Sequence, residues 1–299
     1  MKRFAAAAWL LALLSVPCAA GLTPDSAASE APFSFEKGHV LVQAKIKSDV
    51  PVEVILSTGS EHSLIDSALL RKYKLPAYYS AEAPITGRND RLYSFSTVPE
   101  VRVGGVKETS LSMRFGSMAD VSSRVGREVF GILGVDFFKG RVVQFDFAKK
   151  VVRFLPQSPP DALKGAGPAG GAATRIVLPM RFYKERVTLP IIDDVAFDGK
   201  KIKTLLDTGT VTVVSLSSSA GKQLGLSPLP EKAAPRADKV GTLLLDAYEI
   251  KDVPVLLFAR GSQFDRDQKE FGAVAGSILL QNFAVTFDFN KKVVILERP

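Results

Sequence analysis

The chain contains few of the residues that form disulfides, metal sites or cofactor attachments. Its 299 residues include one cysteine, one tryptophan, two histidines and four methionines. A single cysteine excludes an internal disulfide, and two histidines leave carboxylates as the only plentiful metal ligands. No glycine-rich phosphate-binding loop stands out. The sequence therefore predicts no metal and no cofactor.

The positive charge of the chain is spread along its length. The formal net charge is +8, but the lysines and arginines stand singly or in pairs. A nucleic-acid-binding surface is marked by clustered basic residues, so no nucleic-acid partner is predicted. With 46% hydrophobic and 23% charged residues, the chain is expected to bury a sizeable core.

The first twenty residues have the order of a secretory signal. Lys2 and Arg3 precede an apolar run over residues 4–16, and Pro17-Cys18-Ala19-Ala20 follows. We expect cleavage near Ala20 and a periplasmic or secreted protein. The run is short for a bilayer span, so no stable membrane span is predicted. An uncleaved anchor and a lipid on Cys18 stay open, although Pro17 disfavours the lipid.

Three patterns occur twice in the same order. Residues 54–60 read VILSTGS and residues 204–210 read TLLDTGT, each an apolar strand that runs into a Thr-Gly turn. An apolar pair and a glycine follow each turn, ILG at 132–134 and VAG at 274–276. Two hairpin sequences of ten residues then close the pattern. They begin 142 positions apart, at Val143 (VQFDFAKKVV) and Val285 (VTFDFNKKVV), and indicate an internal duplication.

This order of motifs resembles the aspartic peptidases of the pepsin and retropepsin type. The resemblance covers residues 35–299 and implies an all-β fold of two similar acid-protease-like β-barrel lobes with short helices. In that family each lobe contributes one Asp-Thr-Gly turn to a cleft that binds an extended peptide or protein substrate. The two aspartates share a proton and activate a water molecule. Here Ser57 stands where the first aspartate is expected.

The resemblance assigns a role to each residue of the two turns. Asp207 is the catalytic candidate. The remaining residues support the turns: threonines hydrogen-bond across the lobe interface, glycines allow close backbone approach, and the next hydroxyl residue bonds the outer aspartate oxygen. The supporting residues are Thr208, Gly209 and Thr210 in the second lobe and Ser57, Thr58, Gly59 and Ser60 in the first. The family's flap over the substrate would fall in residues 78–95, with Tyr79 or Tyr93 as its tyrosine; an ordinary surface hairpin is the alternative for this interval.

Composition divides the chain into five segments. We expect a signal peptide at 1–20, a flexible lead-in at 21–34, a first lobe at 35–155, a linker rich in proline, glycine and alanine at 156–173, and a second lobe at 174–299. Short helices are predicted at 66–73 and at 217–224, the second ended by Gly225.

The serine in the first turn leaves several interpretations open. The chain is either an inactive or weak relative that binds peptides, with Ser57 donating a hydrogen bond to Asp207, or a homodimer in which two Asp207 turns meet. A third interpretation has Glu61 supply the missing carboxylate. A serine hydrolase with Ser57, His62 and Asp66 is weighed as well, although no nucleophile elbow surrounds Ser57. A purely structural envelope protein is the remaining class.

Two further acids repeat without a predicted catalytic role. Asp146 and Asp288 lie in Phe-Asp-Phe sequences, and strand alternation on a half-buried sheet explains them. The neighbouring aromatic residues are expected in the core: Phe145, Phe147, Phe287 and Phe289.

Overall fold

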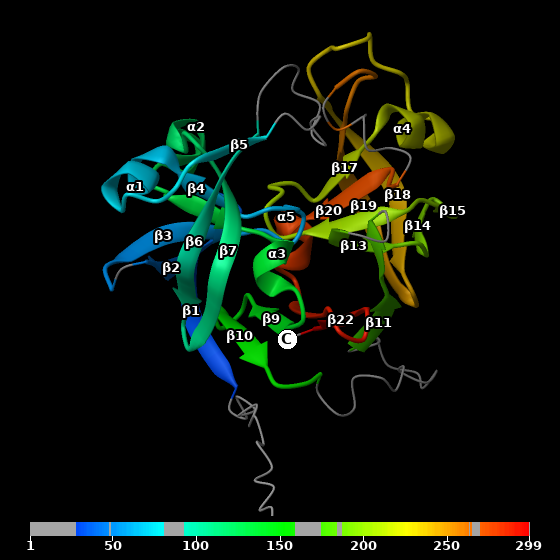
Figure 1. Ribbon diagram of the computed structural model, residues 1–299. Coiled ribbons are helices and arrows are strands. Elements are labelled where there is room, and N and C mark those ends of the chain that lie inside the picture. The colour runs from blue at the N-terminus through cyan, green and yellow to red at the C-terminus, as the bar shows by residue number, and fades with distance from the viewer. Residues whose placement is uncertain are drawn as a thin grey trace, which may run out of the picture.

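The computed structural model describes residues 28–47, 49–80, 93–158, 175–183, 187–262, 264 and 270–298. The predicted signal peptide and most of the predicted linker lie outside these residues. The described part is built mainly of β-strands, arranged as two lobes with a few short helices (Figure 1). The predicted all-β, two-lobed fold class is confirmed.

The sheet of the first lobe closes on itself where β2 pairs with β6. Its strands follow the order β1-β2-β3-β8-β4-β7-β6-β5, and β2 also pairs with β6. These strands are β1 (Ser29–Glu36), β2 (His39–Ile46), β3 (Pro51–Leu56), β4 (Leu64–Asp66), β5 (Tyr78–Ser80), β6 (Tyr93–Val103), β7 (Val106–Gly116) and β8 (Gly131–Leu133). The helices are α1 (Ser67–Lys72), α2 (Ala119–Val125) and α3 (Val135–Phe138).

The second lobe has the same strand order in its central part. The run β13-β16-β20-β17-β19-β18 matches β2-β3-β8-β4-β7-β6, and β14 pairs with β18 as the end of β2 pairs with β6. Its strands are β12 (Arg181–Tyr183), β13 (Val187–Ile192), β14 (Val195–Phe197), β15 (Lys200–Lys201), β16 (Thr204–Asp207), β17 (Val214–Leu216), β18 (Arg236–Leu245), β19 (Tyr248–Leu257) and β20 (Ala273–Gly276). Its helices are α4 (Ser218–Leu224) and α5 (Ser277–Leu280).

The two predicted helices form where their capping residues place them. Asp66 accepts a hydrogen bond from the Ala68 N–H at the start of α1, and Ser217 accepts one from the Ala220 N–H at the start of α4. Gly225 follows α4 in the left-handed conformation, with φ of 83°. Both helix predictions are confirmed to within one residue at each end.

A sheet shared by the two lobes lies beneath them. Its order is β11-β22-β21-β9-β10-β1, built from β9 (Val142–Asp146), β10 (Val151–Leu155), β11 (Arg175–Pro179), β21 (Ala284–Asp288) and β22 (Val293–Glu297). The two repeated hairpins therefore pair directly, β9 with β21. Gln144 lies opposite Thr286, its own counterpart 142 residues later, and donates to the Thr286 hydroxyl at 3.1 Å. An approximate two-fold axis therefore passes through this pair.

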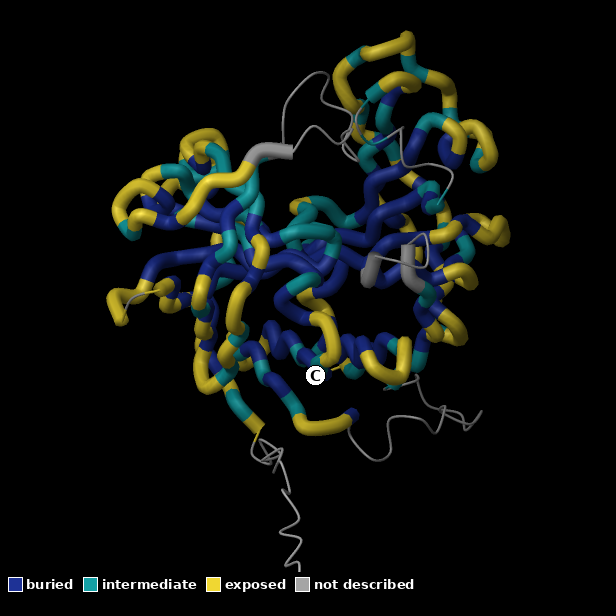
Figure 2. The backbone as a smooth tube through the Cα atoms, in the orientation of Figure 1, coloured by how far each residue is buried: buried dark blue, intermediate teal, exposed yellow. Residues whose placement is uncertain are grey.

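The core runs continuously through the shared sheet into both lobes, as the dark blue strands of Figure 2 show. The four repeated phenylalanines, Phe145, Phe147, Phe287 and Phe289, are buried in it, as predicted. Phe145 packs edge-on against Phe287 across the lobe boundary, with ring centroids 5.9 Å apart. The lobes thus share apolar packing as well as strand pairing.

Two expectations about this base need correction. The lead-in was expected to extend to residue 34, but β1 begins at Ser29 and pairs with β10. Alternate residues of this polar-looking stretch, Ala31 and Phe33, are buried, which anchors the strand. The acids of the repeated hairpins are also buried rather than on a half-buried sheet, at 7% exposure for Asp146 and 1% for Asp288.

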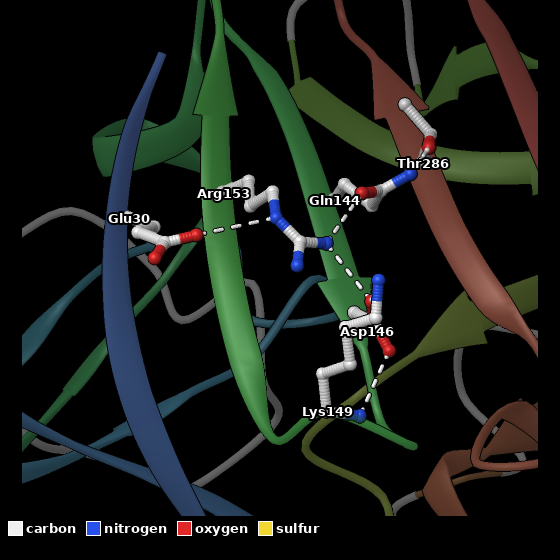
Figure 3. A network of polar contacts seen from close by, with 6 residues as sticks. All are labelled: Glu30, Gln144, Asp146, Lys149, Arg153 and Thr286. Atoms are coloured by element: carbon white, nitrogen blue, oxygen red, sulfur yellow. Dashed lines mark hydrogen bonds and ion pairs between the residues drawn. The ribbon is translucent and has the colours of Figure 1, made fainter.

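Each buried acid holds the turn of its own hairpin. Asp146 accepts from the Lys149 N–H and from Arg153, each at 2.9 Å, and Figure 3 shows Arg153 reaching Glu30, Gln144 and Asp146 together. Asp288 accepts instead from the N–H groups of Asn290 and Lys291 and from the Ser158 hydroxyl. These contacts give the repeated acids a structural role.

We predict that Arg153→Gln lowers stability at neutral pH by about 1–3 kcal/mol. Burial alone would raise the pKa of Asp146, but the Lys149 N–H and Arg153 outweigh it and bring the pKa below its ordinary value. The stabilisation is therefore present above the unfolded-state pKa and is lost as pH falls through the folded-state pKa. Urea unfolding at several pH values measures both effects. Lys149→Gln is the control, because Lys149 is exposed and lies 3.9 Å from Asp146; equal losses in both variants would contradict the assignment.

Candidate active site at the lobe interface

The apolar-apolar-glycine motifs hold the two turns in place. Strand β16 ends at Asp207, which lies beside Gly276 of the parallel strand β20. In the first lobe β3 pairs with β8, and Ser57 follows Leu56. A Cβ atom on Gly276 would lie 2.4 Å from the Thr210 carbonyl oxygen, and one on Gly134 would lie 2.5 Å from that of Ser60. Only glycine lets each turn pack this closely on its supporting strand.

The hydroxyls of the paired threonines join the two turns. Thr58 donates to the Leu206 carbonyl at 2.9 Å, and Thr208 donates to the Leu56 carbonyl at 3.0 Å. Each hydroxyl also accepts from the backbone N–H of the opposite threonine at 3.1 Å. Both threonines are fully buried. These four hydrogen bonds are the cross-lobe pairing that the family resemblance implied.

One carboxylate lies at the centre of the joined turns. Asp207 Oδ1 accepts from Ser57 Oγ at 2.9 Å, from the Gly59 N–H at 2.8 Å and from the Gly209 N–H at 2.7 Å. Its Oδ2 accepts from Thr210 Oγ1 at 2.6 Å. An ionised carboxylate, which only accepts hydrogen bonds, matches these four neutral donors. Asp207 therefore receives the glycine N–H of both turns.

Close approach at this centre depends on the two turn glycines. A Cβ atom on Gly59 would lie 2.3 Å from Asp207 Cγ, and one on Gly209 would lie 2.4 Å from Ser57 Oγ. Ser57 and Asp207 are 6% and 8% exposed, whereas Gly59, Ser60 and Thr210 are half-buried. The Ser57 and Asp207 side chains are thus buried, while the residues that follow them in the turns are partly exposed.

The structure places the remaining turn residues unequally. Thr210 bonds the outer oxygen of Asp207 as the resemblance implied. Ser60 does not have the corresponding contact, because no carboxylate stands at position 57, and its hydroxyl donates to the His62 carbonyl at 2.8 Å.

The residues of the serine-hydrolase interpretation are not brought together. Ser57 bonds Asp207, whereas Asp66 accepts from the N–H groups of Ala68 and Met118. His62 Nε2 lies 3.4 Å from Glu61. Among the described residues, no carboxyl group other than Asp207 is hydrogen-bonded to Ser57. Glu61 therefore does not replace the missing aspartate in this arrangement.

Only the base of the predicted flap lies among the described residues. Residues 81–92 lie outside the described part, and so do the side chains of Tyr79 and Tyr93, although their strands pair with Tyr79 opposite Ser94. An aromatic pair that the sequence did not single out is visible there. Tyr78 is 47% exposed and stacks on Phe95, with ring centroids 5.3 Å apart.

A histidine that the sequence did not single out lies near the site. His39 begins β2, and its Nδ1 is buried without a hydrogen-bond partner in the described part of the chain. Burial and the nearby charge of Arg124 lower the pKa of His39, and the charge of Asp207 opposes them. One signal in the sequence could have drawn attention to His39, the presence of only two histidines in the chain.

Neither a metal centre nor a membrane helix emerges from the described residues. They contain no group of three histidine, cysteine, aspartate or glutamate side chains suited to an ion. No helix among them has the length and hydrophobicity to cross a bilayer.

Comparison with known proteins agrees with this geometry. The sequence model of the aspartyl protease family matches residues 42–137, which include the Ser57 turn. No curated protein matches the chain. Among solved structures, basic 7S globulin from soybean has a similar fold, with a TM-score of 0.50 and 10% identity over 90% of this chain and 94% of that one. The chain is thus similar to the aspartyl protease family over residues 42–137, and its fold is similar to that of basic 7S globulin.

Removing one of the cross-lobe hydroxyls tests the joint between the turns. Thr208→Val keeps the side-chain shape but leaves the Leu56 carbonyl and the Thr58 N–H unpaired, so we expect a loss of about 2–4 kcal/mol of stability in denaturant unfolding. Thr109→Val, on the exposed side of β7, is the matched control and should change stability by less than about 0.5 kcal/mol. A similar effect of both variants would show that the joint is not stabilising.

The environment of His39 predicts a loss of stability on acidification. The folded-state pKa of His39 is lowered. The free energy of unfolding is therefore undiminished above pH 6.5, the ordinary pKa of histidine, and decreases as the pH drops through the folded-state pKa. His39→Gln should flatten the unfolding free energy between pH 7.5 and about pH 5. An unfolding free energy whose pH slope is the same in His39→Gln and in the wild-type protein would contradict the assignment.

Proposed function

We propose that this chain is exported and binds extended peptides between its lobes, without efficient hydrolysis by its own two turns. One observation carries the proposal: Asp207 Oδ1 accepts hydrogen bonds from Ser57 and from the glycine N–H of both turns. A single carboxylate thus occupies the position where the family uses two. The family match and the fold support the peptide as the ligand class.

The missing carboxylate removes one half of the proton chemistry. Amide hydrolysis by water needs a base that takes the water proton and an acid that protonates the leaving nitrogen. Two neighbouring carboxyls divide these tasks because both cannot ionise at once. The Ser57 hydroxyl can donate a hydrogen bond, but it neither shares an acidic proton nor acts as a carboxylate base. Asp207 alone is therefore expected to bind the reacting region without completing the reaction.

The dimer alternative requires a large rearrangement. For two Asp207 turns to meet, the Ser57 turn must leave, and the cross-lobe bonds of Thr58 and Thr208 must break. The Ser57 turn belongs to the same chain and benefits from a high effective concentration. A monomeric site is therefore favoured over a site built from two copies of the second lobe.

The retained turn geometry supports a second candidate function, a peptidase that works when another carboxylate is supplied. Thr58, Gly59, Thr208 and Gly209 hold the backbone that two aspartates would need. A structural envelope protein has weaker support, because a sheet alone does not require a buried carboxylate with four donors.

A mixed peptide library separates these functions. We expect the wild-type protein to retain peptides and to cleave none above background from about pH 3 to pH 8. Ser57→Asp should then raise cleavage by on the order of 10²–10⁴-fold, because it restores the acid and the base, and the added change Asp207→Asn should abolish that gain. Mass spectrometry measures cleavage, and pull-down measures retention.

Ser60→Asp is the control for the added charge. It places a carboxylate three residues away, where the side chain faces the His62 carbonyl rather than Asp207, and no gain is expected. Cleavage by the wild-type protein that disappears in Asp207→Asn would overturn the proposal and favour the peptidase. Failure of the folded wild-type protein to retain any peptide would refute peptide binding.

A further inference from the structure

The tip of the first hairpin lies against the second lobe. Lys37 and Gly38 connect β1 to β2 with φ values of 47° and 84°, the left-handed pair of a two-residue hairpin turn. The Gly38 carbonyl accepts a hydrogen bond of 2.6 Å from the Ser277 hydroxyl. A Cβ atom on Gly38 would lie 2.3 Å from Val211 Cγ1 and 3.2 Å from Ile278 Cδ1. The hairpin tip therefore packs on the segment that follows the Asp207 turn.

Ser277 connects this tip to the carboxylate. Its backbone N–H donates to the Thr210 carbonyl at 2.8 Å, and its hydroxyl lies 3.2 Å from the same oxygen. Thr210 in turn donates to Asp207 Oδ2 at 2.6 Å. Ser277 is fully buried. A short chain of polar contacts thus runs from Gly38 through Ser277 and Thr210 to Asp207.

The corresponding residue of the first lobe shows that the loop itself does not require a hydroxyl. Val135 follows Gly134 as Ser277 follows Gly276, and its N–H donates to the Ser60 carbonyl at 2.9 Å, the counterpart of the bond from Ser277 to Thr210. Val135 is buried as well. An apolar β-branched side chain therefore satisfies the same backbone position, and the hydroxyl of Ser277 is explained by its contact with Gly38.

We infer that Ser277 is a positioning residue that couples the β1–β2 hairpin to the direction of Asp207 Oδ2. The Thr210 carbonyl accepts from Ser277 and the Thr210 hydroxyl donates to Asp207 Oδ2, so movement of the hairpin tip is transmitted to that oxygen. The inference rests on the proposed function, because it makes the hairpin a part of the peptide-binding site. It adds a residue that contacts neither Asp207 nor the turn of the first lobe.

The isosteric pair Ser277→Val and Ser277→Thr provides the test. Both changes add the same volume at a buried position, and only threonine keeps the hydroxyl. We expect Ser277→Thr to retain a mixed octapeptide library within about twofold of the wild-type protein, and Ser277→Val to lose about tenfold in affinity, the equivalent of one hydrogen bond. The ¹³Cγ resonance of Asp207 should shift in the valine variant and stay in place in the threonine variant.

Two further measurements keep the outcomes distinct. Gly38→Ala strains a left-handed position and pushes the tip away from Val211, so it should shift the same Asp207 resonance. If valine at 277 prevents folding, Ser277→Ala replaces it. An unchanged Asp207 resonance in the folded hydroxyl-free variants would overturn the coupling, even if peptides bind. Failure of the wild-type protein to retain the library would refute the proposed function, while the resonance would still decide the coupling.

Discussion

Two backbone turns joined across the lobe interface determine where every functional group of this protein lies. Thr58 and Thr208 are fully buried, and their hydroxyls satisfy the carbonyl and N–H groups of the opposite turn. Because buried backbone groups are costly to leave unpaired, neither turn can move alone. The shared sheet repeats this constraint at the base, where Gln144 meets Thr286. The lobes are therefore joined at two places, the shared sheet and the paired turns, and Asp207 lies in the paired turns.

Departures from the approximate symmetry show where the lobes differ in role. At the base, Asp146 is held by Arg153, whereas its counterpart is held by Ser158 from the start of the linker segment. Both sets of contacts hold a buried acid at its hairpin turn. At the interface, Ser57 faces Asp207, and the result is a single charge with donors from both sides. The first kind of difference preserves the fold, while the second changes the chemistry that the fold can support.

The sequence predicted the features that depend on local spacing. Strand, Thr-Gly turn, downstream glycine and closing hairpin recur in order, so the two lobes and the contact between the turns could be predicted. Contacts that the repeated motifs do not encode could not. The Ser60 hydroxyl lost its expected partner because of the change at position 57, and His39 approaches Asp207 from a strand 168 positions earlier in the chain. The lead-in was misjudged because alternating polar residues masked the two buried ones of β1.

Retention of Asp207 is not by itself evidence of catalysis. The Gly59 and Gly209 N–H groups and the Ser57 and Thr210 hydroxyls all donate to its carboxylate, so the residue also satisfies buried donors that the turns cannot avoid. Loss of a property on changing Asp207 can therefore arise from the joint as well as from chemistry. What separates the two roles is position 57, where a carboxyl group can share a proton with Asp207 and a hydroxyl group cannot. The chemistry that the two turns can support therefore depends on the side chain at position 57.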